Sequence, residues 1–298
     1  MKISVLTATY NREKYLQKLY ESILNNLTSE VEVQWLIMDD GSKDETKQVV
    51  EEFIKESKVE ITYFYQENQG KMQALNNLVN EAEGDLIIEC DSDDYFTDNA
   101  FELIKNEFLK NKKNMDKMYA LCFLKYDQNG NNMGNPFKKD ITTMFDLYFK
   151  EGESGEKALV FNKEIRKQYK YELAPNERFS TEARMYHKMD EKYKIICINK
   201  PIMICEYQQE GYTRNIDKQF VENPVGYFYY FKEILQKDMK RVSLKKRLYT
   251  IKHYILFSVL ANQKNIVKQA NGILNKILII GLYLPGKLAT RKRFIKNK

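Results

Sequence analysis

The segment IIECDSDDYF (residues 87–96) places Asp91, Asp93 and Asp94 within four positions, directly after an apolar run. Carboxylates this close repel one another, so solvent or a cation has to balance their charge. Mg²⁺ and Mn²⁺ prefer oxygen ligands, typically one or two carboxylates together with the phosphates of a bound substrate. A metal here would neutralise a diphosphate and stabilise it as a leaving group. The alternative is a solvated cluster that caps the helix predicted to follow Thr97-Asp98-Asn99.

Polar residues also follow three other predicted strands in the first hundred residues. In a parallel sheet, ligands bind outside the carboxyl ends of the strands. We therefore expect the four polar segments to lie along one edge and form one site. The carboxylate pair and the Gly-Lys dipeptide among them are residue types that a nucleotide pocket uses. The three additional segments are Tyr10-Asn11-Arg12, Asp39-Asp40-Gly41-Ser42 and Asn68-Gln69-Gly70-Lys71.

The elements that must position these residues alternate between strand and helix patterns. Apolar residues at spacings of three and four predict an amphipathic helix over residues 13–27. The helix predicted over 42–57 opens with a Ser-x-x-Glu capping box, Ser42 to Glu45. Such alternation predicts an α/β fold, with a parallel sheet covered by helices on both faces. The expected strands are 2–10, 31–40, 59–68 and 85–90, with a third helix at 70–84, and mixed elements follow residue 96.

Several segments, taken in order, resemble a bacterial family 2 glycosyltransferase of the type that builds cell-surface polysaccharides. The segments are VLTATYNR, MDDGS, ENQGKMQALN, EGDLIIECDSDD, GEK, NERFSTE and EYQQEG. The resemblance implies a GT-A fold, which is a Rossmann-like mixed, mainly parallel sheet flanked by helices. It further implies an inverting transferase that uses a nucleotide-diphosphate sugar and Mn²⁺ or Mg²⁺. It covers residues 1–215, which we predict as one domain, and leaves 216–298 as a helical C-terminal region.

The resemblance assigns nucleotide-binding roles to residues at the first three strand ends. Thr9 and Tyr10 would line the base pocket, with the tyrosine ring against the pyrimidine. Asp40 would accept a hydrogen bond from the imide N–H of uracil, which favours a UDP-sugar over a GDP-sugar. Asp39 would support the turn or the same pocket, and Lys71 would reach the nucleotide or its phosphates.

The aspartate cluster and its neighbours would complete the donor site. Arg12 and Ser92 are included among the predicted nucleotide-binding positions. The resemblance implies that Asp91 or Asp93 meets the ribose and that Asp93 or Asp94 ligates the metal. The sequence leaves the assignment within the cluster open.

Inversion requires a base that deprotonates the acceptor hydroxyl. In the family an acidic residue 80–100 positions after the aspartate cluster usually supplies it, which here points to Glu182 or Glu177 in NERFSTEARMY. Glu182 matches the family pattern better, although an Asp or a Glu-Asp pair is common there. The alternative is an ordinary glutamate in a first helical turn. Gly155-Glu156-Lys157 would form an acceptor-side loop, and Tyr207–Gly211 would close over the diphosphate, unless both are simple turns.

Charge is distributed unevenly along the chain. The net charge is +6, but residues 240–298 hold 15 of the 48 basic residues and no acidic one, so the preceding body is acidic. A basic, amphipathic, aromatic-containing tail favours attachment to an anionic membrane surface. A helical subdomain or a homo-oligomer interface is the alternative, and nucleic acid is disfavoured because no binding motif accompanies the charge. The apolar run 273–284 is too short to span a bilayer.

The remaining composition favours a location in the cytoplasm, at the inner face of the cell membrane. The four cysteines are scattered in apolar surroundings and form no CxxC, which is typical of reduced thiols. The N-terminus does not have the pattern of a signal peptide. A non-catalytic nucleotide-sugar-binding or scaffold protein on the same fold is the alternative function, and a nucleotidyltransferase is disfavoured because TATYNREK contains no glycine. The sugar, the acceptor and the choice between Mn²⁺ and Mg²⁺ are left open.

Overall fold

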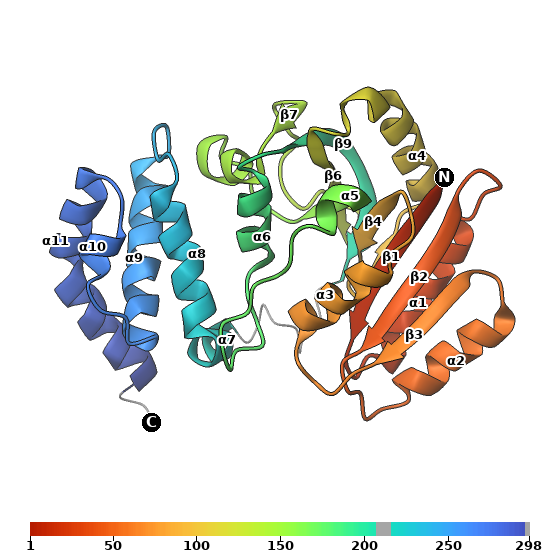
Figure 1. Ribbon diagram of the computed structural model, residues 1–298, viewed down its shortest axis with the longest axis horizontal. Helices are drawn as coiled ribbons and strands as arrows, with labels where there is room; N and C mark the ends of the chain where they lie inside the picture. The colour runs from red at the N-terminus through yellow and green to blue at the C-terminus, as the bar shows by residue number, and fades with distance from the viewer. Residues whose placement is uncertain (207–215, 296–298) are drawn as a thin grey trace. The chain divides into compact units, whose positions relative to one another are not determined.

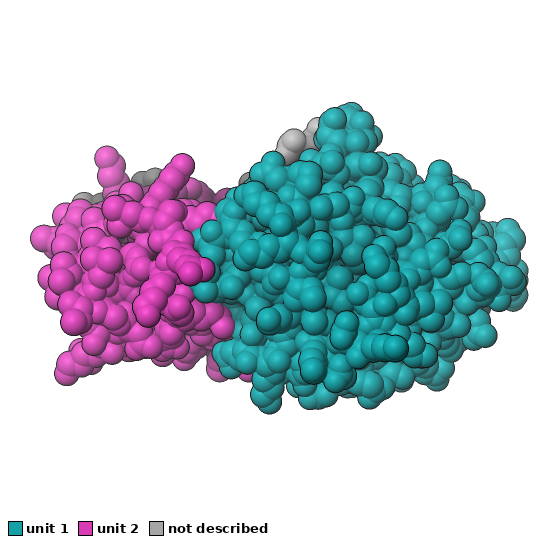
Figure 2. Space-filling view, turned by 90° about the horizontal axis from the view of Figure 1, so that it is seen from above, with its two compact units in different colours: residues 1–171, 187–208 teal, residues 172–186, 209–298 magenta. Residues whose placement is uncertain are grey.

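The computed structural model describes residues 1–206 and 216–295, which form two compact units (Figure 1, Figure 2). The first unit contains residues 1–171 and 187–208, and the second contains 172–186 and 209–298. The predicted closing segment Tyr207–Gly211 lies outside the described residues. The predicted domain boundary after residue 215 stays a prediction.

The first unit is built on one nine-stranded mixed sheet with the strand order β3-β2-β1-β4-β8-β6-β9-β5, and β7 pairs with β9. Strands β1 to β4 are parallel to one another, whereas β8 and β5 run antiparallel to their neighbours. The predicted α/β class and GT-A-type architecture are confirmed. The strands are β1 Lys2–Thr9, β2 Glu32–Asp39, β3 Glu60–Tyr65, β4 Leu86–Glu89, β5 Asp94–Phe96, β6 Met118–Asp127, β7 Ile141–Thr142, β8 Lys157–Asn162 and β9 Lys194–Cys205. The helices that accompany them are α1 Glu13–Asn25, α2 Thr46–Glu56, α3 Lys71–Glu81, α4 Ala100–Asn111 and α5 Lys163–Arg166, with a 3₁₀ turn at Lys112–Asn114 and a π-helical turn at Asp146–Lys150.

The core of this unit lies between the sheet and helices α1, α2 and α4. Tyr20 of α1 stacks on Phe53 of α2 with ring centroids 4.2 Å apart, and Trp35 of β2 lies 6.1 Å from each ring. Such aromatic contacts add to the stabilisation that burial of the rings already provides. The periodicity that predicted the first helix therefore reflects a buried face.

The predicted capping box at the start of α2 is wrong. The helix begins at Thr46, and the carboxylate of Asp44 accepts the Thr46 N–H at 3.1 Å. The Ser42 hydroxyl instead accepts the backbone N–H of Asn11 at 2.9 Å, while Glu45 donates its N–H to the Glu13 carboxylate at 2.7 Å. Ser42 and Glu45 are thus used to join the loops after β1 and β2, because the neighbouring loop offers them partners before the helix begins.

The second unit is helical in its described part. Phe228 stacks on Tyr254 at 5.2 Å between two of its helices. The sequence of the basic tail predicts an apolar stripe from residues that recur at spacings of three and four, namely Leu244, Leu248, Ile251, Ile255 and Val259. Ile251 and Ile255 of this stripe are buried. Leu244 of the same stripe is 60% exposed. The helices are α7 Ile216–Glu222, α8 Pro224–Gln236, α9 Leu244–Leu260, α10 Ile266–Gln269 and α11 Ile273–Thr290, followed by a π-helical turn at Arg291–Ile295, and α6 Glu182–Met189 begins in this unit.

The last helix is longer than the apolar run 273–284 that predicted it. Pro285 lies inside α11, and helical structure extends through Ile295. By length and composition alone, residues Ile273–Ile295 are long and apolar enough to cross a membrane. Of the most apolar window, 17% is buried inside the protein. Pro285, which is exposed, lacks the N–H that a helix uses for its hydrogen bond to the residue four positions earlier, so one such bond of α11 is missing there.

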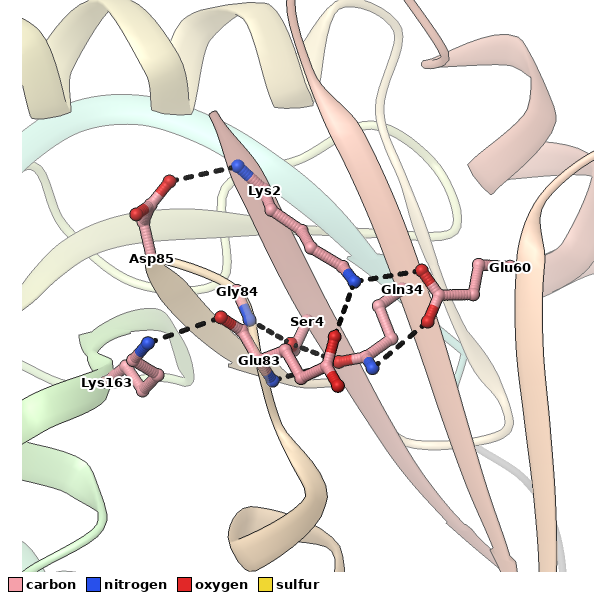
Figure 3. A network of polar contacts seen from close by, with 8 residues as sticks. All are labelled: Lys2, Ser4, Gln34, Glu60, Glu83, Gly84, Asp85 and Lys163. Carbon is pink, nitrogen blue, oxygen red and sulfur yellow. Dashed lines mark hydrogen bonds and ion pairs between the residues drawn. The ribbon is translucent and has the colours of Figure 1, made fainter.

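A polar network joins the amino-terminal ends of the central strands (Figure 3). The Ser4 hydroxyl donates to the Gln34 side chain at 2.7 Å and accepts the Gly84 N–H at 2.8 Å. Lys2 forms an ion pair with Glu83 at 2.9 Å. These contacts fix where β4 begins, and hence where its carboxyl end and the aspartates that follow it lie.

We predict that Gly84→Ala destabilises the protein by about 1–3 kcal/mol, since overpacking a tight contact has a cost of this order. A Cβ at position 84 would lie 2.5 Å from the backbone nitrogen of Ser4, which cannot move without disturbing β1. Urea unfolding followed by circular dichroism measures the change.

Gly281→Ala in α11 is the matched control. No atom lies within 4 Å of the added Cβ, so helix propensity alone should make this change neutral or stabilising by up to about 1 kcal/mol. Equal stability of the two variants would show that the approach of residues 84 and 4 is not a constraint.

Candidate active site

The carboxyl ends of the parallel strands lie along one edge of the sheet, as the sequence predicted. Thr9 is paired in register with Asp39, and Asp39 with Tyr65. The loops that follow are joined as well, because Lys43 donates its N–H to the Asn11 side chain at 2.8 Å. Side chains from separate parts of the sequence therefore meet at this edge.

The two aspartates at the end of β2 hold the surrounding loops in place. Asp39 is buried and accepts the Ser42 N–H and the Tyr63 hydroxyl, both at 2.7 Å. This matches the turn-supporting alternative that the sequence left open for Asp39. Burial and this hydrogen bond together raise the pKa of Tyr63.

The carboxylate of Asp40 is also engaged within the protein. Its Oδ1 accepts from the Gln66 side chain at 2.7 Å and from the Gln69 N–H at 2.8 Å, and its Oδ2 accepts the Gly70 N–H at 2.8 Å. The predicted contact with the uracil imide would compete with these three bonds. In this structure Asp40 instead fixes the glycine turn, φ +94° at Gly70, from which α3 and Lys71 start.

The end of β1 offers groups for a ligand. The Thr9 side chain is buried, and its hydroxyl oxygen has no hydrogen-bond partner among the residues that the structure describes. Buried polar groups normally have partners, so an isolated one at a strand end is suited to a bound molecule. Tyr10, the next residue, exposes 44% of its surface. Both observations agree with the predicted base pocket, which stays a prediction.

Lys71 and Asp91 form an ion pair between the start of α3 and the end of β4. The Lys71 Nζ lies 2.6 Å from Asp91 Oδ1. Burial by itself would raise the pKa of Asp91, but the positive charges of Lys71, Lys125 and Arg12 outweigh it and lower that pKa. Four of the predicted binding positions (Arg12, Lys71, Asp91 and Asp93) thus influence one another electrostatically.

Lys125 was missed by the sequence analysis, although it binds the third aspartate. Its Nζ lies 2.7 Å from Asp94 Oδ2 and 3.5 Å from a carboxylate oxygen of Glu156, in the predicted acceptor-side loop. Burial would lower the pKa of Lys125, but Asp94, Glu156 and Asp91 raise it well above its ordinary value. The available signal was a lysine in the otherwise apolar strand MYALCFLKY.

Asp93 differs from its two neighbours because, within the described residues, Lys71 pairs with Asp91 and Lys125 with Asp94, whereas Asp93 has no ion pair. Burial, and then the charges of Asp91 and Asp94, raise the pKa of Asp93 from 3.8 to about 6 and outweigh the opposing charge of Arg12. A divalent cation would relieve this, so Asp93 fits a metal ligand. Asp94 fits poorly, because Lys125 already occupies the position of a cation beside it. Burial raises the pKa of Asp94 too, against the opposing charge of Lys125. Ser92, between Asp91 and Asp93, is buried.

In the described part of the chain, no group of three or more His, Cys, Asp or Glu side chains is arranged to hold a metal ion. This agrees with a site in which a single carboxylate contributes alongside phosphate oxygens, which is common for Mg²⁺.

The two predicted bases belong to the second unit and differ in their surroundings. Glu177 accepts the N–H of Val225 at 2.6 Å and that of Gly226 at 2.7 Å, so both of its oxygens cap the start of α8. Burial raises the pKa of Glu177 in spite of these bonds. Glu182 is the first residue of α6 and is partly exposed. The capping role of Glu177 makes it the weaker candidate.

A comparison with known families decides the classification. The sequence profile described as Glycosyl transferase family 2 matches residues 4–168, more than half of the chain. The chain belongs to this family. Its match runs from within β1 to beyond β8 and thus includes the carboxyl ends of β1 to β4.

Individual relatives match over parts of their length. An uncharacterized glycosyltransferase of Mycoplasma pneumoniae is 35% identical over 42% of this chain and 43% of its own. The poly(ribitol-phosphate) beta-N-acetylglucosaminyltransferase TarS of Staphylococcus aureus is 33% identical over 32% of this chain and 17% of its own. The GalNAc(5)-diNAcBac-PP-undecaprenol beta-1,3-glucosyltransferase of Campylobacter jejuni is 26% identical over 80% and 75%. The chain therefore spans less than half of the length of the first two relatives.

Solved structures confirm the fold. S. aureus TarS 1–349 in complex with UDP superposes with a TM-score of 0.59 at 16% identity, covering 98% of this chain and 92% of the other. The mannosyltransferase PcManGT of Pyrobaculum calidifontis, in complex with GDP-Man and Mn²⁺, gives a TM-score of 0.56 at 15% identity, covering 97% and 82%. At these identities the likeness concerns the fold.

We predict that Asp93→Asn stabilises the metal-free protein at pH 8 by about 1–3 kcal/mol, since one pKa unit corresponds to about 1.4 kcal/mol and the site is partly exposed. The folded state binds the Asp93 proton more tightly than the unfolded state, so this group destabilises the fold as pH rises through about 6. The difference between variant and native protein should vanish as pH falls to about 4.

Thermal unfolding in EDTA across this pH range measures the effect. Asp98→Asn, at an exposed position two residues before α4 begins, is the control and should leave stability unchanged. An Asp93→Asn protein that is no more stable than the native one at pH 8 would contradict the prediction.

Proposed function

We propose that this chain is an inverting, metal-dependent glycosyltransferase that moves a sugar from a UDP-sugar to a cell-surface polysaccharide, teichoic acid or lipid-linked acceptor. The observation that carries the proposal is the assembly at one sheet edge of the Lys71–Asp91 pair, the destabilised carboxylate of Asp93 and the Thr9 hydroxyl, which has no hydrogen-bond partner among the described residues. Family membership supports the reaction class.

On the donor side, Thr9 and Tyr10 would receive the base, with the exposed tyrosine ring against the pyrimidine. Lys71 would exchange its partner Asp91 for a phosphate of the donor, which would leave Asp91 to accept from the ribose. Arg12 lies close enough to the cluster to lower the pKa of Asp91 and would add positive charge near the diphosphate. The UDP complex of TarS supports a uridine donor.

Asp93 would hold the metal, Mn²⁺ or Mg²⁺, together with oxygens of the diphosphate. When bound, the metal would supply positive charge that stabilises the departing nucleotide diphosphate. Asp94 would not bind the metal directly; its carboxylate would stay paired with Lys125 beside the site. The Mn²⁺ complex of the P. calidifontis mannosyltransferase supports a divalent metal.

On the acceptor side, Glu182 would take the proton from the attacking hydroxyl. The names of two relatives, a poly(ribitol-phosphate) transferase and an undecaprenol-linked glycan transferase, support a polymeric or lipid-linked acceptor. Such acceptors are made at membranes, and we propose that the protein works at the cytoplasmic face of the cell membrane.

A donor screen tests the proposal. Thermal shift and UDP release would be followed with UDP-glucose, UDP-galactose, UDP-GlcNAc, UDP-GalNAc and GDP-mannose, with and without Mn²⁺. We expect metal-dependent stabilisation by one UDP-sugar, and loss of both signals in Asp93→Ala, because the diphosphate then lacks its cation. Asp98→Ala is the matched control and should behave as the native protein.

The outcomes separate the alternatives. Sugar-nucleotide binding without turnover over a broad panel of acceptors would favour the non-catalytic reading. No response to any nucleotide, with or without metal, would mean that the aspartates form only a charged turn.

Substitutions at the two glutamates should have different effects, on transfer activity at Glu182 and on stability at Glu177. Glu182→Gln should reduce transfer by at least about 100-fold, which is typical of a missing general base, without a matching loss of stability. Glu177→Gln should instead destabilise the protein by about 1–3 kcal/mol, because an amide NH₂ would face the backbone donor of Val225 or Gly226. Acceptor-dependent turnover and urea unfolding of both variants measure this. Full transfer by Glu182→Gln would exclude it as the base.

A further inference from the structure

Helix α11 exposes a continuous apolar face. Its members recur at intervals of four, three, four and four residues, which places them on one side of an α-helix. Each exposes more than half of its surface, from 51% to 79% when the neighbouring Leu274 is included. The face consists of Ile273, Ile277, Ile280, Leu284 and Leu288. Exposed apolar residues that gather in this way mark a contact surface.

The opposite side of α11 is used within its own unit. Asn275, Ile279 and Thr290 are buried, and they follow the same spacing with an offset of two residues, about 200° around the helix. Asn275 accepts a hydrogen bond of 2.6 Å from Arg247 of α9. The helix is therefore fixed on one side by α9 and leaves its apolar face outward.

Positive charge borders the apolar face. Lys276 and Lys287 stand at the same angular position beside the stripe, eleven residues apart, and Arg291 and Lys292 follow the helix. Arg293 is paired with Asp217, but residues 240–298 contain no acidic residue. The surface that complements this face is thus apolar and negatively charged at its rim.

We propose that α11 lies in the plane of an anionic bilayer, with its apolar face among the upper acyl chains and its lysines at the headgroups. Lysine side chains can reach the headgroup level while their methylene stems stay in apolar surroundings. Helices with one apolar and one basic side bind in this way, and binding strengthens with anionic lipid. The inference gives the proposed membrane location a defined surface, but it rests on the geometry of α11 and not on the transfer reaction.

A spanning orientation of α11 conflicts with its packing. Crossing the hydrocarbon would place Lys276, Lys287 and the polar side chain of Asn275 at or near membrane depth. It would also separate α11 from α9, although Gly286 packs so closely on Ile255 that an added Cβ would lie 2.9 Å from that side chain. An in-plane helix keeps all of these contacts.

Vesicle binding of the full chain, without donor or metal, tests the inference. The native protein should bind vesicles of equal parts phosphatidylglycerol and phosphatidylcholine and lose most of this binding on pure phosphatidylcholine or at high salt. Ile280→Asp/Leu284→Asp should weaken binding at least about tenfold, since it places charge on the face that would enter the bilayer. Both residues are 65% exposed, so the fold should tolerate the changes, as thermal unfolding can verify.

A matched control introduces the same kind of substitution, an exposed apolar residue to Asp, in the first unit. Leu109→Asp/Ile141→Asp changes two comparably exposed apolar residues of the first unit, 54% and 44%, and should bind vesicles as the native protein does. Lys276→Glu/Lys287→Glu should weaken binding to the anionic vesicles only. Single tryptophans at positions 273, 280 and 288, read against the buried native Trp35 as background, should show equal and shallow quenching by brominated lipids.

Several results would overturn the inference. If the native protein does not bind anionic vesicles, or if the Ile280→Asp/Leu284→Asp variant binds them as tightly as the native protein, this face is excluded as the membrane contact. A dimer that the Asp/Asp variant dissociates, in a protein without vesicle affinity, would assign the face to a second copy. Deep quenching at 280 with shallow quenching at 273 and 288 would mean that the helix spans. Because no sugar transfer is measured, the proposed reaction can fail or stand independently.

Discussion

The charge of three aspartates at one strand end is the constraint on which the first unit depends. Their mutual repulsion, in a partly buried position, has to be balanced from outside the segment. Lys71 reaches Asp91 from the start of α3, and Lys125 reaches Asp94 from β6. Asp93 has no such ion pair among the described residues, and burial together with the charges of Asp91 and Asp94 raises its pKa to about 6, so this carboxylate is the one left in need of a cation. A folded scaffold with one uncompensated carboxylate at a sheet edge is suited to a metal–diphosphate ligand.

The compensation works only because the strand ends are held in register. At the carboxyl edge, Asp40 binds the turn that precedes Lys71, so the lysine that meets Asp91 is positioned by a second aspartate. At the opposite edge, Gly84 packs against the backbone of β1 and sets where β4 starts. The acidic residues after β2 therefore act on the site indirectly, through the loops they fix. This explains how a carboxylate in a binding motif can have a supporting role.

The second unit carries the surface that we propose to bind the membrane. Its helices bury aromatic residues against one another, while α11 keeps an apolar side outward. A basic region without acidic residues would be difficult to keep folded on its own account, since like charges repel. On an anionic surface the same charge distribution becomes favourable. A transferase with a polymeric or lipid-linked acceptor gains from this, because enzyme and acceptor are then confined to the same surface.

The sequence alone determined the order of strands and helices over the first 90 residues, the α/β class, the family and the set of strand-end residues. These depend on local periodicity and on short motifs, which neighbouring residues specify. Only the tertiary structure decided the partners: Lys125 for Asp94, the loop 66–70 for Asp40, the helix α8 for Glu177 and the Asn11 loop for Ser42. Each of these partners is more than 25 residues distant in sequence. The physical reason is that a carboxylate takes whichever donor the fold brings within 3 Å, and no local pattern encodes that choice.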